Sequence, residues 1–536
     1  MAKRAQPITP LQTIGGAFVA LVVLIIFGSL GAVILHAEGV SGLRASDWAA
    51  IRFTLLQAML SALVSCLAAI PVARALARRR FIGRSAYISL MGAPFILPVI
   101  VAVMGLLAIF GRAGWLNAAL EGIGLGTIDI YGLFGVVLAH VFLNLPLATR
   151  LILQAWLSLP AERTRLAHSL NFTTADMRRH FEWPLLRATL PGAALIIFLI
   201  CTTSFAVALI LGGGPGATTV ELAIYQAFRF DFDLGRAALL GVIQVGICIS
   251  AGLLAWRFVS AADFGAGLDR AAMAWPGDNW WVRINDGAAL IFAGTFLLLP
   301  LGAVTADGLT SVIGLPLSTW QAALRSIVLA LASTALAVGL ALPIALLIAG
   351  HAARARLEGA GLKGAGLKAA GLEAVGLLSI AVSPLVIGTG LFLIVFPVAN
   401  PVTLSLPITG MVNALVALPF LLRALIPAAA QAEASQGRLA DALGMTGTAR
   451  LRHAILPRLR RPLGFGAGLA AAFSMGDLGV IALFSAQGQE TLPLEMYRLF
   501  GSYRTTDAQG AAVLLMGLSL GLFWMFDRGG RVNAAT

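Results

Sequence analysis

The sequence predicts an all-α, polytopic transmembrane protein with about 12 spanning helices, arranged as two parallel repeats of six. Of its 536 residues, 59% are hydrophobic and 11% are charged, whereas a soluble domain carries about 25% charged residues. Apolar runs of about 20 residues or more recur along the chain, a length that suits a hydrocarbon core about 30 Å thick. The same motifs also occur twice at a constant spacing, which indicates an internal repeat.

Each apolar run is predicted to be a helix, because a backbone in lipid has to satisfy its hydrogen bonds within the segment. A β-barrel would show short alternating segments instead. The first run follows Lys3 and Arg4, but it is long enough to span and no clear cleavage site follows, so we expect an uncleaved helix. The spans of the first half are expected near residues 15–36, 51–77, 86–110, 131–156, 190–211 and 237–258. Those of the second half are expected near residues 286–305, 322–349, 374–398, 404–427, 463–486 and 508–526.

The basic residues predict the orientation. With the N-terminus in the cytoplasm, most of the 37 lysines and arginines fall in cytoplasmic segments, where such residues collect. We therefore expect both termini in the cytoplasm, and we attribute the net charge of +13 to topology rather than to nucleic-acid binding. Cys66, Cys201 and Cys248 lie in apolar runs, so we expect buried small side chains and no disulfide framework. No histidines and carboxylates share metal-ligand spacing, so no metal is predicted.

The repeat has a geometric consequence. Trp48 and Pro71 recur as Trp320 and Pro343, at an offset of 272 residues. Because each half holds an even number of spans, both halves enter the membrane with the same polarity and matching loops face the same side. A stretch rich in glycine and leucine, 350–376, is predicted to be a mobile cytoplasmic loop. The expected organisation is a first transmembrane repeat over 1–260, a cytoplasmic linker over 261–285 and a second transmembrane repeat over 286–536.

Two polar loops, 158–184 and its copy 430–457, carry the main functional signal. In the first copy a helix is expected to begin with Ser158 as its cap, a proline in its first turn and an acid at the positive end of its dipole. This helix should end at Asn171 and its counterpart at Gly444. Both residue types tolerate the left-handed conformation that follows a helix C-terminus.

A second short helix should follow the turn in each copy. In the first copy Thr174 and Asp176 can start it, and it should stop before Pro184. Such a loop can fit a groove on a partner and move as a rigid unit. The alternative is an ordinary helical connector, but two copies in one register favour a paired function. The candidate docking residues are Arg165, Ala167, Leu170, Asn171 and Pro184 in the first copy and Arg438, Ala440, Leu443, Gly444 and Pro457 in the second.

The second copy, with Gly444, then nine further positions, then Ala-Ile-Leu-Pro457, resembles the cytoplasmic loop signature of binding-protein-dependent ABC importer permeases, the EAA loop. This resemblance implies the type I, MetI-like permease fold. It also implies that the short helix of each loop, the coupling helix, docks into a separate ATP-binding subunit and transmits its motion. The first copy departs from the signature, with Asn171 for the usual glycine and Trp183 for the usual leucine. Both copies have arginine, Arg165 and Arg438, in place of glutamate.

Several further strings resemble one subfamily, the fused two-repeat permease of the thiamine and thiamine pyrophosphate importer: 78–81, 96–99, 138–146, 211–227 and 501–504. The resemblance implies an inner-membrane permease that moves thiamine, or its phosphates, inward by alternating access. Its implied partners are two copies of an ATP-binding subunit, a periplasmic thiamine-binding protein and the lipid bilayer. Fused permeases for ferric iron, polyamine or phosphonate are the alternatives within the family. An ion-coupled secondary transporter is the alternative from another class, and it would need no paired docking loops.

The chain itself is not predicted to be an enzyme. A phosphate-binding loop needs Gly-Lys followed by Ser or Thr, and the three lysines are followed by Arg4, Gly364 and Ala369. No catalytic constellation is present and no cofactor is expected. Energy must therefore come from another polypeptide.

Three acids are candidates for a translocation pathway that accepts a cation: Asp477, Glu221 and Glu495. Asp477 lies in an apolar span, where an ionisable residue calls first for a functional hypothesis. The other two lie in the outer loops before the last span of each half. The alternatives are a buried acid that serves packing for Asp477 and solvated loop acids for Glu221 and Glu495.

Overall fold

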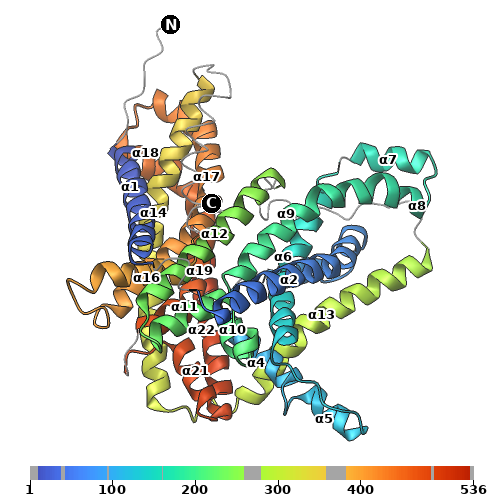
Figure 1. Cartoon of the computed structure of the whole chain (residues 1–536). Helices are drawn as coiled ribbons and strands as arrows, with labels where there is room; N and C mark the ends of the chain where they lie inside the picture. Colours follow the sequence, from blue (N-terminus) through green and yellow to red (C-terminus); the bar gives the residue numbers. More distant parts are fainter. Residues whose placement is uncertain are drawn as a thin grey trace.

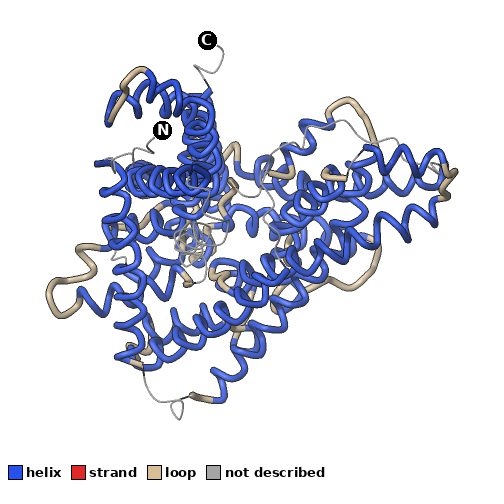
Figure 2. The backbone as a smooth tube through the Cα atoms, turned by 90° about the horizontal axis from the view of Figure 1, so that it is seen from above, coloured by secondary structure: helices blue, strands red, loops and turns tan. Residues whose placement is uncertain are grey.

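The computed structural model describes residues 10–37, 43–92, 96–159, 161–258, 279–357, 382–484 and 488–531, and these form helices and connecting turns with no strand among them (Figures 1 and 2). The helices of the first half are α1 Pro10–His36, α2 Ala45–Arg78, α3 Arg84–Leu90, α4 Val99–Phe110, α5 Trp115–Gly122, α6 Leu133–Leu157, α7 Ala161–Ser169, α8 Thr174–Met177, α9 Trp183–Thr202, α10 Ala206–Leu211, α11 Val220–Arg229 and α12 Leu234–Phe258. Those of the second half are α13 Trp280–Gly308, α14 Leu317–Leu357, α16 Pro384–Val395, α17 Ser405–Ala442, α18 Gly447–Arg450, α19 Leu456–Met475, α20 Gly479–Phe484, α21 Leu492–Gly501 and α22 Thr505–Arg531.

The predicted all-α membrane fold is confirmed. Within the described residues, 11 helical segments are long and apolar enough to cross a membrane, and α16 is a shorter apolar helix. The predicted ninth span, 374–398, contains α16, and its first part lies outside the described residues. All three cysteines are free and buried, as expected.

Two predicted boundaries need correction. The linker was expected to extend to residue 285, but α13 begins at Trp280, because the side chain of Asn279 accepts a hydrogen bond from the N–H of Val282 at 3.0 Å and caps the helix. Residues 261–278 of that linker lie outside the described part. The stretch 350–376 was expected to be a loop, but its first residues, 350–357, complete α14.

Three predicted spans are interrupted rather than continuous. Span 86–110 is divided between α3 and α4, and α4 starts after Pro98. Span 190–211 contains the later part of α9 and then α10. Span 463–486 contains the later part of α19 and then α20. At the end of α9 the hydroxyl of Thr202 donates to the carbonyl of Leu199 at 2.8 Å. Such side-chain bonds to the backbone compete with helix continuation, and hydropathy does not register them.

The break after α9 leaves carbonyl groups without helical partners, and amide side chains from other helices supply the bonds. The Nε2 group of Gln57 in α2 donates to the carbonyl of Cys201 at 3.0 Å. The Nε2 group of Gln244 in α12 donates to the carbonyl of Thr202 at 2.8 Å. Because a backbone group in lipid cannot bond to water, these two buried glutamines are structural requirements of the broken helix.

The first helix of each half packs on the opposite half. Helix α1 contacts α14 and α16, and α13 contacts α2 and α4. Both crossings depend on a glycine. A Cβ at Gly105 in α4 would lie 2.7 Å from the carbonyl oxygen of Pro300 in α13, and a Cβ at Gly390 in α16 would overlap the carbonyl oxygen of Ser29 in α1. The two halves are therefore interlocked, and each supplies a helix to the other.

Candidate functional site

Loop 1, residues 161–182, begins with α7 and turns sharply at Asn171. Asn171 has a φ of +49°. The N–H of Phe172 donates to the carbonyl of Ala167 at 3.0 Å, and the N–H of Asn171 donates to that of His168 at 3.1 Å. This pair of bonds is a Schellman motif, which closes the end of a helix around one left-handed residue.

Loop 2, residues 433–455, contains the same motif 273 residues later. Gly444 has a φ of +65°. The N–H of Met445 donates to the carbonyl of Ala440 at 2.8 Å, and the N–H of Gly444 donates to that of Asp441 at 3.1 Å. The predicted left-handed turn is thus present in both copies, and in Figure 1 both loops lie towards the same end of the molecule, α7 and α8 on one side and α18 on the other.

The first helix of loop 2 is not separate, contrary to prediction. Helix α17 runs unbroken through 38 residues into the turn. Glu433, a good helix former, stands where loop 1 has Pro160, which lies outside the described residues. The prediction that Ser158 caps α7 is also wrong. Its hydroxyl donates to the carbonyl of Ala155 at 2.8 Å, so Ser158 belongs to the end of α6.

The second helix of each loop begins where predicted but does not stop before the proline. Helix α8 starts at Thr174, and the side chain of Thr173 accepts from the N–H of Asp176 at 3.3 Å. A π-helical turn, 178–182, then carries the chain into α9 with Pro184 in its first turn. A matching π-turn precedes Pro457. Proline is tolerated in the first turn of a helix, so the chain passes from loop to membrane helix without a break.

The predicted docking residues divide into an outward and an inward set. Pairs of leucines four residues apart are exposed at equivalent places, Leu166 and Leu170 at 59% and 58%, Leu439 and Leu443 at 56% and 64%. Ala167 and Ala440 are instead buried, at 1% and 2% exposure. The remaining exposed members are Arg165, Asn171, Pro184, Gly444 and Pro457, and the side chain of Arg438 lies outside the described part.

The two loops are anchored by different ion pairs, which sequence reasoning missed. In loop 2 the guanidinium of Arg450 pairs with Glu433 and, at 2.5 Å, with Asp441, all within the loop. In loop 1 the carboxylate of Glu182 pairs instead with Arg78 and, at 3.3 Å, with Arg74, both in α2. The sequence indicated the ion pairs of loop 1 only through Glu182, an acid at a place where loop 2 has Ile455.

Asp477 lies in the gap between α19 and α20. Its Oδ1 accepts from the N–H of Val480 at 3.4 Å, so it caps α20, while its Oδ2 has no hydrogen-bond partner among the described residues. The neighbouring Gly476 lies against Pro98 of the first half, with its Cβ position 3.1 Å from the Cα of that proline. Asp477 is therefore next to the boundary between the halves.

Glu221 also lies at that boundary. It is 1% exposed, which excludes the solvated loop acid considered from the sequence. The hydroxyl of Ser383, in the opposite half, lies near enough to the carboxyl group of Glu221 to lower its pKa, and Oε1 of Glu221 has no hydrogen-bond partner in the described part. Helix α11 is not one of the spanning helices. Burial raises the pKa of Glu221 to about 8, although the hydroxyl of Ser383 opposes that shift.

Glu495 behaves differently from the other two acids. It is also 1% exposed, so it is not a solvated loop acid either. Its oxygens accept from Arg498 at 2.8 and 2.9 Å and from the hydroxyl of Ser318 at 2.9 Å. The charge of Glu495 is thus already balanced by Arg498, which distinguishes it from Glu221 and Asp477.

Spanning helices in two interlocked halves, with matched loops at one end, define a polytopic permease of two tandem units. No family model matches the chain. It is 39% identical over 543 residues to the thiamine transport system permease protein ThiP of Escherichia coli, covering 98% of both chains. It is 38% identical over 545 residues to that of Salmonella typhimurium, again with 98% of both chains covered. The chain belongs to the family of thiamine transport system permease proteins.

The similarity to a shorter permease supports the tandem arrangement. The sulfate transport system permease protein CysW of Synechococcus elongatus is 28% identical over 277 residues, which is 92% of that protein and 48% of this chain. One whole permease thus matches about half of the chain, as expected when two such units are joined. The fold is accordingly that of the type I, MetI-like ABC importer permeases.

Proposed function

We propose that the chain is the inner-membrane permease of an ATP-driven importer and carries thiamine into the cytoplasm by alternating access. The chain matches thiamine transport permeases from Escherichia coli and Salmonella typhimurium over nearly their whole length. Both loops and both termini lie in the cytoplasm, and two copies of a separate subunit bind and hydrolyse the ATP. A periplasmic protein delivers the thiamine.

The observation that carries the coupling role is the repeated pair of exposed leucines. Leu166 and Leu170 stand before one left-handed turn, and Leu439 and Leu443 before the other. Exposed apolar side chains gathered on one face mark sites of protein association. Two equivalent faces at one end of the chain suit two copies of one partner. An ion-coupled transporter has no use for such a pair.

The substrate pathway is proposed to pass Glu221 and Asp477. Both acids lie where the two halves meet, and each has a carboxyl oxygen without a partner among the described residues. Acids held within a membrane protein commonly mark the route of a cation. Thiamine carries a permanent positive charge, so two such acids at the boundary suit it.

The test is uptake into proteoliposomes that contain the chain, its ATP-binding subunit and its binding protein. Labelled thiamine should enter only when ATP is present inside the vesicles, on the side of the ATP-binding subunit. An excess of unlabelled thiamine should reduce this uptake, whereas ferric iron, polyamine or phosphonate should not. Uptake that survives without ATP but needs an ion gradient would establish the secondary-transporter alternative. Cysteines placed at the exposed His180 and His453 should both react from the cytoplasmic face, and labelling from opposite faces would refute the topology.

A further inference from the structure

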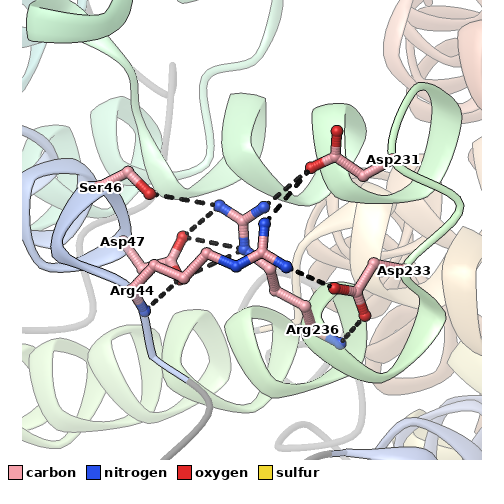
Figure 3. Close-up of polar contacts among 6 residues, drawn as sticks. All are labelled: Arg44, Ser46, Asp47, Asp231, Asp233 and Arg236. Atoms are coloured by element: carbon pink, nitrogen blue, oxygen red, sulfur yellow. Dashed lines mark hydrogen bonds and ion pairs between the residues drawn. The ribbon is translucent and has the colours of Figure 1, made fainter.

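Helix α2 is held by buried charges at the end that is remote from loop 1. The carboxylate of Asp47, fully buried, accepts from Nη2 of Arg236 at 2.6 Å and from its Nε at 3.2 Å. The same guanidinium reaches Asp231 at 2.9 Å, and Arg44 reaches Asp233 at 3.0 Å. Figure 3 shows these side chains converging from the start of α2, from the turn between α11 and α12 and, for Arg236, from the first turn of α12. The start of α2 is thus fixed to that turn.

Helix α2 is held by buried charges at its other end too. Arg78 pairs with Glu182 of loop 1, and their side chains are only 4% and 5% exposed. The next residue, Arg79, pairs at 2.7 Å with Asp286 of α13, whose side chain is 5% exposed. Adjacent arginines at the end of α2 therefore connect loop 1 of the first half with the first helix of the second half.

The length of α2 allows one helix to join these two clusters. It has 34 residues, which at 1.5 Å per residue is about 50 Å. A bilayer with its headgroups is about 40–45 Å thick. The clusters therefore lie near opposite faces of the membrane, joined by one continuous helix.

The second half has lost this arrangement. Thr319 stands where the first half has Asp47, Ala508 stands in place of Arg236, and Ile455 in place of Glu182. None of these side chains can form an ion pair. The matching outer turn of the second half instead contains an ion pair between Arg504 and Asp507, three residues apart, at 2.6 Å. The difference is specific to α2 and its partners.

We propose that α2 is an ion-pinned strut that carries the displacement of loop 1 to the outer end of the pathway, and through Asp286 to the second half. Glu182 and Asp47 are its positioning residues, one at each end. Loop 1 then acts on the outer end through the ion pairs of α2, while loop 2 is joined to the membrane region by its own continuous helix, α17. The inference rests on the proposed coupling of both loops to an ATP-binding subunit.

The test compares the two ends of the strut in the complete reconstituted complex. Glu182→Gln and Asp47→Asn each remove one charge, and removal of one partner from a buried pair leaves the other uncompensated. Both should lower ATP-driven thiamine uptake by about tenfold or more and should abolish the rise in ATP hydrolysis caused by the loaded binding protein. Hydrolysis without binding protein should persist. Glu182→Asp and Asp47→Glu, which keep the charge, should restore part of the coupling.

The matched control is Asp129→Asn. Asp129 pairs with Arg112 at 3.5 Å, with both side chains more than half exposed, so this variant should couple as the wild type does. Asp47 lies far from the ATP-binding subunit, and a loss of hydrolysis stimulation there would have no local explanation. If Glu182→Gln and Asp47→Asn both behave like Asp129→Asn, the strut is refuted.

A second measurement separates the strut from the choice of substrate. Phe232 and Tyr503 are exposed at 80% and 92% and occupy equivalent outer turns of the two halves. Spin labels on cysteines at these positions should change their separation when ATP binds the wild-type complex, and should not do so in Glu182→Gln. If ATP changes the separation of the labels but thiamine is not taken up, the proposed substrate is refuted and the strut is supported. The same change in wild type and Glu182→Gln would refute the strut.

Discussion

The left-handed turn at the end of each coupling helix can be tested by Gly444→Val. Gly444 has a φ of +65°, and no heavy atom lies within 4 Å of the place that a Cβ would occupy. A new side chain therefore meets no neighbour, and its cost comes from the backbone alone. The left-handed conformation costs an L-residue about 1–2 kcal/mol, and a β-branched residue fits it worst. At 1.4 kcal/mol per factor of ten, the turn in the valine variant should be about tenfold or more less populated.

Loss of the turn would break the bond between the N–H of Met445 and the carbonyl of Ala440 and would displace the exposed face of Leu443. We therefore expect Gly444→Val to bind the ATP-binding subunit about tenfold or more weakly, measured by titration of the subunit onto the chain in nanodiscs. Gly444→Asn is the matched control, because asparagine already occupies the equivalent place in loop 1 and tolerates the conformation best after glycine. Equal binding by the valine and asparagine variants would show that the turn does not position the docking face.

The other predictions concern the docking face, the pathway and the broken helix. Leu443→Ala should weaken binding of the ATP-binding subunit by about three- to tenfold, since full burial of a leucine contributes about 1.5–3 kcal/mol and Leu443 has 64% of its surface still to bury; Ala440→Ser, at a buried place, should not reproduce this effect. Glu221 has a raised pKa of about 8, so it is mostly neutral below that pH and charged above it, and a cation favours the charged form. The apparent affinity for thiamine should therefore rise between about pH 7 and pH 9, and Glu221→Gln should remove that difference. Gln57→Leu should lower the melting temperature of the purified chain, because a buried carbonyl without a partner costs about 1–3 kcal/mol, and an unchanged melting temperature would show that the bond to Cys201 is dispensable.

Much of the fold follows from local sequence. The apolar runs predict where the membrane helices lie, since length and hydropathy are properties of a segment alone. Asn171 and Gly444 predict the left-handed turns for the same reason, because the conformational preference belongs to the residue. The interruption after α9 could not be predicted from hydropathy, since it depends on the hydroxyl of Thr202 and on a glutamine, Gln57, that lies far away in sequence.

The ion pairs that anchor loop 1 could not be predicted for a different reason. Arg79 and Asp286 are separated by 207 residues, and they meet only because α13 crosses onto the first half. That crossing depends on the close approach of Gly105 to Pro300, which no local pattern specifies. The exposure of Leu170 and the burial of Ala167 likewise depend on how the loop lies against the membrane helices.

The two halves share one architecture but distribute their polar groups unequally. The first half supports its broken helix with buried amides, where Gln57 and Gln244 bond the free carbonyls. In the second half, leucine and methionine stand at the matching places, 329 and 516, and the break is capped from within by Asp477. Fusion into one chain permits such divergence, because each half always meets the same partner and need not remain complementary to a copy of itself. Because the acid cap occurs at one break only, the two acids proposed for the pathway, Asp477 and Glu221, come from inequivalent places in the two halves, an asymmetry that a dimer of identical units could not have.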